Sequence, residues 1–379
     1  MQSEGYLIAD NLQIKPYKGC ASTTSPTNIG FSLLAEICGC KLGFVTANEA
    51  CHNINMILDE VKKLPLWKGN LYNWYNLNTK KPVSNFVSSV DSGNFVACLY
   101  AVKEFFKENY DKIGELKADL MIVNTDLKAL YDENENLFYI GFDGEKYVGH
   151  YDLMNSEARI LSTLYIAQSR DTEHFRCLQR DYASIGGNVL LSWSGTAFEA
   201  LMPDIFFPTP EKSVFGNTSL RTAKIQSQTK YCSLWGISES GYYAFDEELR
   251  YQYYAFGINK LALRNEKNKG VISPYASALC INELPEEVYD NLHLAEQNGL
   301  FQEYGFYESV DCEGKQRVVA SYMAHHQGML LASLTNFLAE NYIQKLMCKN
   351  LKLSSALTIY NENVPRVAFG LKNNEMRKN

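Results

Sequence analysis

The sequence predicts an all-α domain. Stretches in which apolar residues recur at helical spacing follow one another along most of the 379 residues. No Pro/Ser-rich linker, low-complexity tract or repeat of fixed period divides them. With 46% hydrophobic residues, the chain can bury a large core. We therefore expect one domain over residues 1–379, built from antiparallel helix pairs of the kind that can close into a ring.

The helical pattern is clearest in the first third of the chain. Residues 28–43 and 47–64 predict a helix pair joined by a short turn at Gly43, and apolar side chains fall on one face in 91–108 and in 114–131. Residues 285–298 begin with Pro285 and stop at Gly299, the expected helix punctuation. The other expected helices are 156–168, 172–184, 217–230 and 246–255, which are weaker, and 318–330 and 333–346.

One β-hairpin interrupts the helices. Residues 138–142 and 147–151 flank Asp143-Gly144-Glu145, a strong turn signal. Short apolar runs such as 188–193 are either strands or buried connections.

Composition excludes several classes of function. A net charge of -7 argues against nucleic-acid binding and offers no positive surface to anionic lipid. The sequence has no phosphate-binding glycine loop and no Gly-x-Ser-x-Gly elbow, which disfavours nucleotide-dependent chemistry and a serine hydrolase, and we expect no cofactor. We expect neither a signal peptide nor a membrane-spanning segment, because no apolar stretch follows a basic one at the start and no run of about 18 apolar residues occurs. The ten scattered cysteines favour reduced, buried thiols in a cytoplasmic protein.

Seven short islands combine Trp or Tyr, Gly and Ser with an acid, an amide or a His. They are Tyr72–Asn76, Ser88–Asn94, Ser156–Arg159, Ser192–Glu199, Trp235–Ser240, Tyr304–Glu308 and Met323–Gly328. Most lie at the ends of the expected helices. Aromatic rings cover the apolar face of a pyranose, while carboxylates and amides bind its hydroxyls or move its protons. The islands therefore predict a carbohydrate site made of loops on a helical frame.

Two glutamates are the main candidates for catalysis. Glu157 starts an apolar helix, so it either stabilises the helix dipole or belongs to a sugar-binding loop that begins at Tyr151. Arg159 is expected to pair with Glu157 or to bind a substrate hydroxyl. Glu239 lies in an aperiodic stretch between small residues, where a ligand can approach the backbone, and Trp235 offers a stacking surface. For Glu239 we favour function over a solvated turn.

The remaining islands supply candidates for substrate binding. Asp91 precedes a long helix and is first of all a helix cap, which is compatible with a position in a cavity. Asn73, Trp74 and Tyr75 fit a sugar subsite better than a dry core, because buried amides need partners. Trp193 gives a similar but weaker signal.

The His325-His326-Gln327 run does not predict a metal site. Adjacent residues of a helix point about 100° apart, and no acidic or Cys partner stands at ligand spacing. We expect one His to bind hydroxyls together with Gln327, and the other to be buried.

The islands and the motif Thr24–Gly30 together resemble the glycoamylase-like domain of cyclic β-1,2-glucan synthases, from about Leu7 to about Leu338. The resemblance implies an (α/α)6 barrel. It also implies the cyclisation reaction of that family, in which linear β-1,2-glucan is cut and its ends are rejoined with retention of the anomer. A related family of inverting endo-β-1,2-glucanases shares the fold, with a general acid equivalent to Glu157 and no Glu at the position of Glu239.

The resemblance assigns Glu157 as the acid/base and Glu239 as the nucleophile, which would stay ionised through hydrogen bonds from Ser238, Ser240 or backbone N–H groups. It also implies the glycosyltransferase and phosphorylase modules of a parent synthase as partners. Trp74, Trp193, Trp235 and Tyr307 would form aromatic subsites. The full set of expected substrate contacts is Asp91, Asn73, Trp74, Tyr75, Arg159, Trp193, Trp235, Tyr307, Glu308, His325, His326 and Gln327.

This chain departs from the family at two positions. Ser22-Thr23 stand where family members often carry Arg-Arg, and Asn76 stands where an Asp often follows the aromatic motif. Two other readings stay open: an inverting endo-β-1,2-glucanase, and a non-catalytic glucan-binding domain in which Glu157 and Glu239 do not share a cleft.

Overall fold

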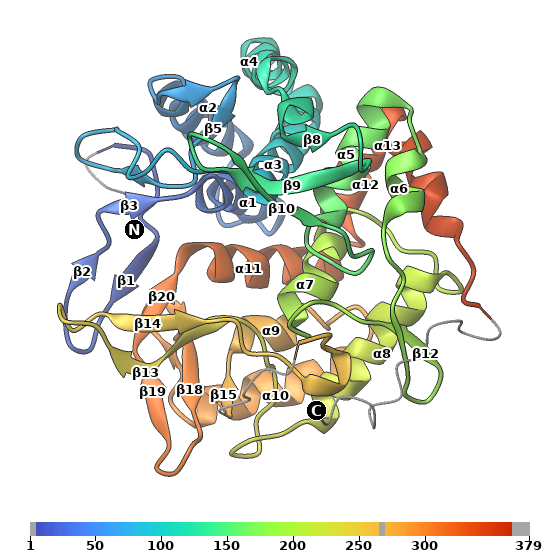
Figure 1. The fold of residues 1–379 in the computed structure, drawn as a ribbon. Helices are drawn as coiled ribbons and strands as arrows, with labels where there is room; N and C mark the ends of the chain where they lie inside the picture. The colour runs from blue at the N-terminus through green and yellow to red at the C-terminus, as the bar shows by residue number, and fades with distance from the viewer. Residues whose placement is uncertain (1–4, 265–269, 366–379) are drawn as a thin grey trace.

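The computed structural model describes residues 5–264 and 270–365 and is rich in helix (Figure 1). Its α-helices are α1 Pro26–Lys41, α2 Ala47–Val61, α3 Ser89–Glu108, α4 Lys112–Asn124, α5 Arg159–Ser169, α6 Glu173–Cys177, α7 Ala197–Leu201, α8 Val214–Gln228, α9 Pro274–Ala278, α10 Pro285–Gln297, α11 Ala324–Leu338, α12 Tyr342–Lys349 and α13 Leu351–Ala356. Short 3-10 turns are η1 Leu127–Leu130, η2 Met202–Ile205, η3 Asn259–Leu261 and η4 Leu357–Asn361.

The strands are short and mostly pair in hairpins or small sheets. They are β1 Asn11–Gln13, β2 Gly19–Cys20, β3 Thr23–Thr24, β4 Leu66–Trp67, β5 Asn70–Leu71, β6 Tyr75–Asn76, β7 Val87–Ser88, β8 Tyr131–Asp132, β9 Leu137–Phe142, β10 Tyr147–Tyr151, β11 Tyr182–Ser184, β12 Asn188–Leu190, β13 Ser240–Phe245, β14 Tyr251–Tyr254, β15 Val271–Ile272, β16 Phe301–Gln302, β17 Gly305–Phe306, β18 Ser309–Asp311, β19 Arg317–Val319 and β20 Ser321–Met323.

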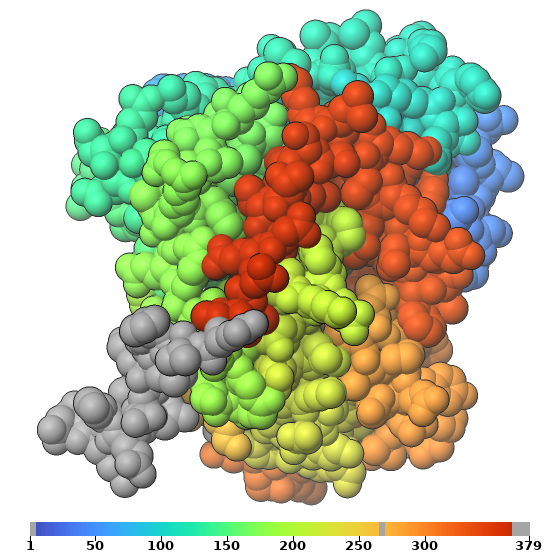
Figure 2. All heavy atoms as spheres, turned by 90° about the vertical axis from the view of Figure 1, so that its right-hand side faces the viewer, coloured from blue at the N-terminus to red at the C-terminus, as the bar shows by residue number. Residues whose placement is uncertain are grey.

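Consecutive odd-numbered helices from α1 to α11 pack on one another, except that α5 and α7 make no comparable contact. α1 packs on α3, α3 on α5, α7 on α9, α9 on α11, and α11 returns to α1. The remaining helices pack outside them: α2 against α1, α4 against α3, α8 against α7 and α10 against α9. The C-terminal helices lie on the outer surface, where α12 contacts α3 and α13 contacts α5 (Figure 2).

Glycines in the islands allow the helices to approach closely. A Cβ added to Gly93 of α3 would lie 2.8 Å from Leu161 Cβ on α5, and one added to Gly328 of α11 would lie 2.6 Å from Phe31 Cβ on α1. Neither space accepts a methyl group without movement of the neighbouring helix. These two glycines therefore serve helix packing.

The expectation of an all-α chain with one hairpin is wrong in its second half. The hairpin β9–β10 forms in the predicted place, with Tyr147 opposite Phe142. A second hairpin, β13–β14, occupies the region where residues 246–255 were expected to be helical. Its Tyr-Gln-Tyr-Tyr strand is rich in a β-favouring residue, and cross-strand pairing overrides the weak helical pattern. Further small sheets, β15-β18-β19 and β2-β1-β20, lie near it (Figure 1).

Several helix boundaries also differ from the expectation. α4 ends at Asn124, and its apolar stripe faces outward, with Leu116 58% and Val123 73% exposed. The expected helix 172–184 is reduced to α6 followed by β11, and residues 318–330 begin with β19 and β20 before α11. None of the helices in the described ranges is long and apolar enough to cross a membrane.

The cysteines do not all behave as buried thiols. Cys232 and Cys312 form a disulfide, with their Cα atoms 5.9 Å apart. Cys20 and Cys177 are exposed. The expectation of a buried free thiol holds for three residues, Cys38, Cys98 and Cys280.

Arg159 joins α5 to α7 through the core. Its Nη2 atom donates to Asp204 Oδ1 at 2.7 Å and to Ala200 O at 3.2 Å. The guanidinium stacks over the Phe215 ring at 4.4 Å, and the residue is only 4% exposed. The expectation that Arg159 pairs with Glu157 or binds a sugar hydroxyl is therefore wrong, because its donors face Asp204 and α7.

Arg159→Met tests this structural role. The substitution leaves Asp204 as a buried carboxylate without its cation, so we expect the free energy of unfolding to fall by about 3–5 kcal/mol. The matched control is Arg176→Met, which removes an exposed pair with Glu173 and should cost about 0–1 kcal/mol. Denaturant unfolding measures both; equal stability of the two variants would contradict the role.

Candidate active site

A cavity of about 440 Å³ lies at the ends of α3, α5 and α11. Its wall brings together residues from segments far apart in the sequence. They include Asp10, Thr27, Asn73, Trp74, Phe86, Asp91, Asn94, Ile140, Tyr151, Glu157, Phe198, Glu239, Tyr253, Met323 and His325. This volume is typical of a small-molecule site, and the mixture of aromatic, amide and carboxylate groups suits a sugar. Glu157 and Glu239 therefore share one aromatic-lined cavity.

Glu157 occupies the turn that leads into α5. Ser156 stabilises this turn: its Oγ accepts from Ala158 N at 3.2 Å, and its carbonyl accepts from Arg159 N at 3.0 Å. The Glu157 carboxyl is hydrogen-bonded to Tyr151. Burial raises its pKa well above the ordinary value, and the nearby charge of Glu239 raises it further. Glu157 is thus suited to hold a proton, as a general acid must.

Glu239 sits between a tight loop and β13. Gly236 in this loop has φ 124°, and a Cβ there would lie 2.7 Å from Ser273 O, so only glycine fits. The Tyr275 hydroxyl donates to Glu239 O at 2.7 Å and holds the backbone. The Tyr253 hydroxyl donates to Glu239 Oε2 at 2.9 Å. Glu239 is therefore held both at its backbone and at its carboxylate.

Burial raises the pKa of Glu239 to about 7, while the hydrogen bond from Tyr253 acts to lower it. The expected donors, Ser238 and Ser240, are engaged elsewhere. Ser238 Oγ accepts from Phe198 N at 3.0 Å, and Ser240 Oγ donates to Ser238 O at 3.4 Å. That part of the sequence interpretation is wrong, because both serines turn into the core. Tyr253 supplies the hydrogen bond instead.

Asp91 lies in the first turn of α3 but is not its cap. Ser88 caps the helix, accepting from Asp91 N at 3.2 Å. The Asp91 carboxylate accepts from the Thr27 hydroxyl at 2.6 Å, and burial raises its pKa. In the side-chain orientation that gives both the amide nitrogen and the amide oxygen of Asn73 a partner, the nitrogen donates to Asp91 Oδ2 at 2.9 Å and the oxygen accepts from the Trp74 indole N–H at 3.2 Å. The structure thus brings Asn73, Trp74 and Asp91 together at the cavity.

The two adjacent histidines point in different directions. His325 lines the cavity, and its Nδ1 lies 3.0 Å from Asn28 Oδ1. Burial lowers its pKa to about 3. His326 is buried against the Tyr275 ring, with centroids 3.8 Å apart, and its Nδ1 lies 2.9 Å from Glu308. Gln327 donates to Phe306 O at 2.9 Å and does not line the cavity. Within the described ranges, no group of three His, Cys, Asp or Glu could hold a metal ion.

Other expected substrate contacts lie outside this cavity. Tyr75 is fully buried, and its hydroxyl donates to Pro65 O at 2.6 Å. Trp235 is packed in the core, where its backbone N–H donates to Asn291 Oδ1 at 3.0 Å. Trp193 lies under the Arg264 guanidinium at 4.7 Å.

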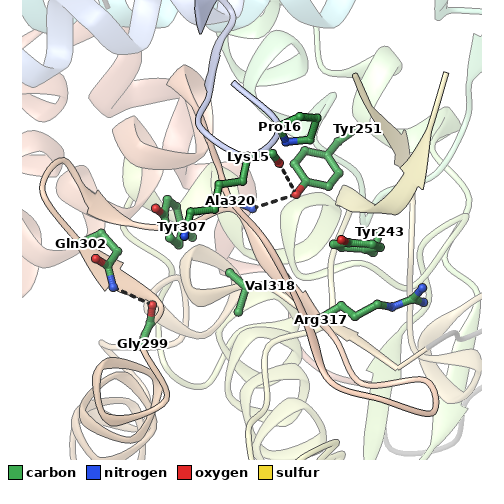
Figure 3. A pocket seen from close by; sticks show the side chains of 10 residues that line it. All are labelled: Lys15, Pro16, Tyr243, Tyr251, Gly299, Gln302, Tyr307, Arg317, Val318 and Ala320. Carbon is green, nitrogen blue, oxygen red and sulfur yellow. Dashed lines mark hydrogen bonds between the residues drawn. The ribbon is translucent and has the colours of Figure 1, made fainter. Parts of the chain in front are cut away.

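Two expected contacts lie near β18. Glu308 is buried with His326, and it does not line the cavity. Tyr307 faces a separate pocket of about 390 Å³, together with Tyr243 and Tyr251 (Figure 3).

The sequence interpretation missed Tyr253 and undervalued Glu199. Tyr253 escaped notice because its segment was expected to be a helix; the aromatic run of β14 was the available signal. Glu199 accepts from Ser192 Oγ at 2.8 Å and from Ser194 N and Thr196 N at 3.1 Å. It thereby orders the loop before α7, and its charge raises the pKa of Glu157 and of Glu239.

Known structures share this fold. An endo-beta-1,2-glucanase from Chitinophaga pinensis, in complex with sophorotriose and glucose, superposes with a TM-score of 0.75 at 16% identity, covering 93% of this chain and 91% of that one. An endo-beta-1,2-glucanase mutant from Talaromyces funiculosus, in complex with beta-1,2-glucan, gives a TM-score of 0.72 at 12% identity and covers 94% and 83%. At these identities the likeness establishes the fold alone.

Sequence comparison gives a family. The cyclic beta-(1,2)-glucan synthase NdvB of Rhizobium meliloti (strain 1021) is 25% identical over 506 residues, which covers 96% of this chain and 18% of that protein. The chain thus spans less than a fifth of the length of this relative. The family model Glycoamylase, described as "Putative glucoamylase", matches residues 150–351, more than half of the chain and both glutamates. The chain therefore belongs to the glycoamylase family.

Proposed function

We propose that this protein cleaves linear β-1,2-glucan with retention of the anomer, through a glycosyl-enzyme that either water or a sugar hydroxyl resolves. The observation that supports this most is the pair Glu157 and Glu239, which border one cavity with unequal proton affinities. The relatives' names supply the linkage: one is a cyclic beta-(1,2)-glucan synthase, and another is an endo-beta-1,2-glucanase.

Each carboxyl has a distinct part in the proposed reaction. Glu157 donates its proton to the glycosidic oxygen while the Glu239 carboxylate attacks the anomeric carbon, so the C–O bond to the leaving chain breaks and an ester forms. Glu157, now ionised, then takes a proton from water or from a sugar hydroxyl, whose oxygen displaces Glu239. Water yields a shorter chain, whereas a hydroxyl at the far end of the same chain yields a ring.

The cavity wall supplies the sugar contacts in this proposal. Trp74 offers a ring face to a glucosyl unit, and Asp91 and Asn73 present oxygens and an amide to its hydroxyls. His325 is neutral at working pH because burial lowers its pKa, so it binds a hydroxyl without adding charge. Of the expected contacts, Trp74, Asp91, Asn73 and His325 remain in this proposal, and the others lie outside the cavity.

At the level of architecture, we propose that residues 1–379 form one domain and that the odd-numbered helices close an (α/α)6 barrel. The sequential contacts from α1 to α11, with Arg159 linking α5 to α7, support closure. We also propose that the glycosyltransferase and phosphorylase modules of a larger synthase are its partners, because the relative NdvB is much longer than this chain.

Incubation with substrate tests the proposed glucan-cleaving activity. Incubated with linear β-1,2-glucan, the protein should give shortened or cyclic products, resolved by mass because a ring is lighter by one water. Glu157→Gln and Glu239→Gln each remove one essential group, so we expect turnover to fall by at least about 10²–10⁴-fold. Glu286→Gln, at an exposed position on α10, is the control and should keep full activity. Unchanged chain length with the native protein would overturn the proposal in favour of a binding domain.

The stereochemistry of the product tests the role of Glu239. A nucleophile requires the two carboxyls to lie roughly 5–5.5 Å apart and yields the β anomer first, whereas a base that activates water yields the α anomer. We expect NMR spectra recorded early in the reaction to show β-configured reducing ends. An initial α product would reassign Glu239 as the base of an inverting glucanase and leave Glu157 as the acid.

The pH profile follows from the two raised pKa values. Activity needs Glu239 ionised and Glu157 protonated. We therefore expect kcat/KM to rise as the pH rises through about 7, where Glu239 loses its proton. It should fall again at higher pH as Glu157 ionises, because burial and the charge of Glu239 raise the pKa of Glu157 well above its ordinary value. A profile that is flat from about pH 5 to pH 7 would contradict this assignment of Glu239.

A further inference from the structure

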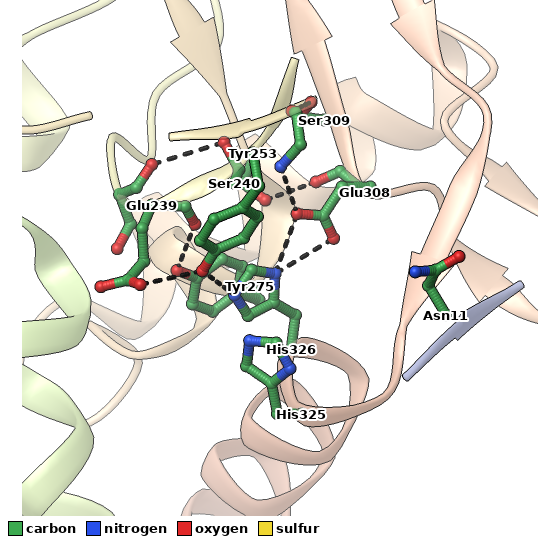
Figure 4. A network of polar contacts seen from close by, with 12 residues as sticks. Asn11, Glu239, Ser240, Tyr253, Tyr275, Glu308, Ser309, His325 and His326 are labelled. Carbon is green, nitrogen blue, oxygen red and sulfur yellow. Dashed lines mark hydrogen bonds and ion pairs between the residues drawn. The ribbon is translucent and has the colours of Figure 1, made fainter. Parts of the chain in front are cut away.

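A polar chain lies behind Glu239 (Figure 4); its end at His326 and Glu308 is buried, whereas Tyr253, at the cavity, is 41% exposed. The Tyr253 hydroxyl lies 2.9 Å from Glu239 Oε2 and 3.4 Å from His326 Nε2. His326 Nδ1 lies 2.9 Å from Glu308 Oε1 and 3.1 Å from Oε2. Glu308 also accepts from Gly241 N at 3.0 Å. Two carboxyl groups are thus connected by an unbroken row of groups that can each give or take a proton.

The number of protons shared by Tyr253, His326 and Glu308 limits the hydrogen-bond arrangements that these groups can adopt. Tyr253 has one hydroxyl proton and two neighbouring acceptors. When Glu308 is ionised it can only accept, so His326 must carry its proton on Nδ1, and Nε2 is bare and competes for the Tyr253 proton. When Glu308 is protonated it donates to Nδ1, so Nε2 carries the proton and Tyr253 is directed to donate to Glu239. The charge on Glu308 therefore determines how well Tyr253 supports the Glu239 carboxylate.

We propose that Glu308, acting through His326 and Tyr253, shares one proton with Glu239 and keeps Glu239 ionised before the reaction. Glu308 and His326 are positioning residues in this arrangement, since neither lines the cavity. The transfer balances: Glu308 gives a proton to Nδ1, Nε2 gives one to the Tyr253 oxygen, and Tyr253 gives one to Glu239. One proton moves between two carboxyls, and no other group changes charge. The inference rests on the proposed role of Glu239 in glucan cleavage.

The surroundings of Glu239 favour a shared proton. Acidic groups face it from each neighbouring element: Glu157 before α5, Asp91 of α3, Glu199 of α7 and Glu308 beside β18. Of the described residues that line the cavity, none is a Lys or Arg. Two ionised carboxylates would repel each other here with little solvent to screen them. Only one of the pair is readily ionised at a time.

The pKa shifts of Glu308 and Glu239 agree with a shared proton. Burial raises the pKa of Glu308 to about 7, close to that of Glu239. Burial lowers the pKa of His326 well below its ordinary value, so the ring relays a proton without holding a charge. His326 is 1% exposed and Glu308 2%, and water does not compete for these hydrogen bonds. Tyr275 stacks on His326 and fixes the plane of the ring.

The tautomer of His326 gives a test that needs no substrate. In protein with ¹⁵N-labelled histidine, we expect His326 to stay neutral and to move from the Nε2–H to the Nδ1–H form as the pH rises through about 7. In Glu308→Gln, the amide donates to Nδ1 and fixes the Nε2–H form at every pH. A single tautomer in the native protein from about pH 5 to pH 9 would overturn the proposal, whether or not the protein cleaves glucan.

The pH profile of kcat/KM gives a second test through a double-mutant cycle. Glu308→Gln should move the acidic limb to lower pH, because Tyr253 then always donates to Glu239. Tyr253→Phe should move it to higher pH by about one to two units, through loss of a hydrogen bond to a charged group.

The double variant separates the relay from plain charge repulsion. If the effect of Glu308 passes through Tyr253, Glu308→Gln should shift the limb much less in the Tyr253→Phe background. An equal shift in both backgrounds means that Glu308 acts by charge alone and overturns the relay. Glu286→Gln should leave the limb in place. Tyr253→Phe retains the aromatic ring at the cavity edge. This variant should therefore leave the buried Glu308–His326 pair undisturbed.

Discussion

The site depends on one electrostatic constraint: several carboxyl groups meet in one cavity, and among the described residues no Lys or Arg lines it. Burial disfavours the charged form of each carboxyl group, and each negative charge raises the pKa of the neighbouring carboxyl groups. Protons must therefore be distributed unequally. Both Glu157 and Glu239 face Asp91 and Glu199, and burial raises the pKa of both, while the hydroxyls of Tyr151 and Tyr253 act to lower the pKa of Glu157 and Glu239 respectively. Glu157 additionally meets the charge of Glu239, whereas Glu239 meets that of Glu308. In the proposed reaction, acid and nucleophile would thus differ through their surroundings and not through their chemistry.

The fold provides this arrangement by holding the ends of its helices together. Glu157 and Arg159 are two residues apart at the start of α5, and on a helix such positions point to roughly opposite sides. One therefore faces the cavity while the other reaches into the core, where Asp204 binds it. The same geometry excludes the direct ion pair between the two residues. An ion pair beside Glu157 would lower its pKa, so the separation preserves the proton that catalysis uses.

Local patterns were sufficient to predict the first helices, the hairpin β9–β10 and the island positions that carry Glu157, Glu239, Asp91 and Trp74. They were insufficient wherever a contact spans a long stretch of sequence. No local sequence pattern shows that Trp235 and Tyr75 point into the core. An aromatic residue in such a motif looks the same whether it is buried or binds a sugar.

Tyr253 lies at the cavity but was not predicted, again because its contacts span a long stretch of sequence. Its strand forms by pairing with β13, and its partner His326 lies 73 residues further along the chain. The sequence therefore indicated the two glutamates that share the cavity better than the residues that support them.

In the proposed reaction, the choice between hydrolysis and ring closure would not lie with the carboxyl pair, because both outcomes would pass through the same ester. It would lie with the group that reaches the anomeric carbon after the leaving chain departs. Around the two acids the wall carries Trp74, Phe86, Phe198 and Ile140, whose apolar surfaces hold water weakly and accept the C–H face of a sugar. A glucan chain lying on these residues would displace water from the ester and bring its own hydroxyl close. We therefore propose that the apolar part of the wall, more than the acids, decides whether transfer competes with hydrolysis.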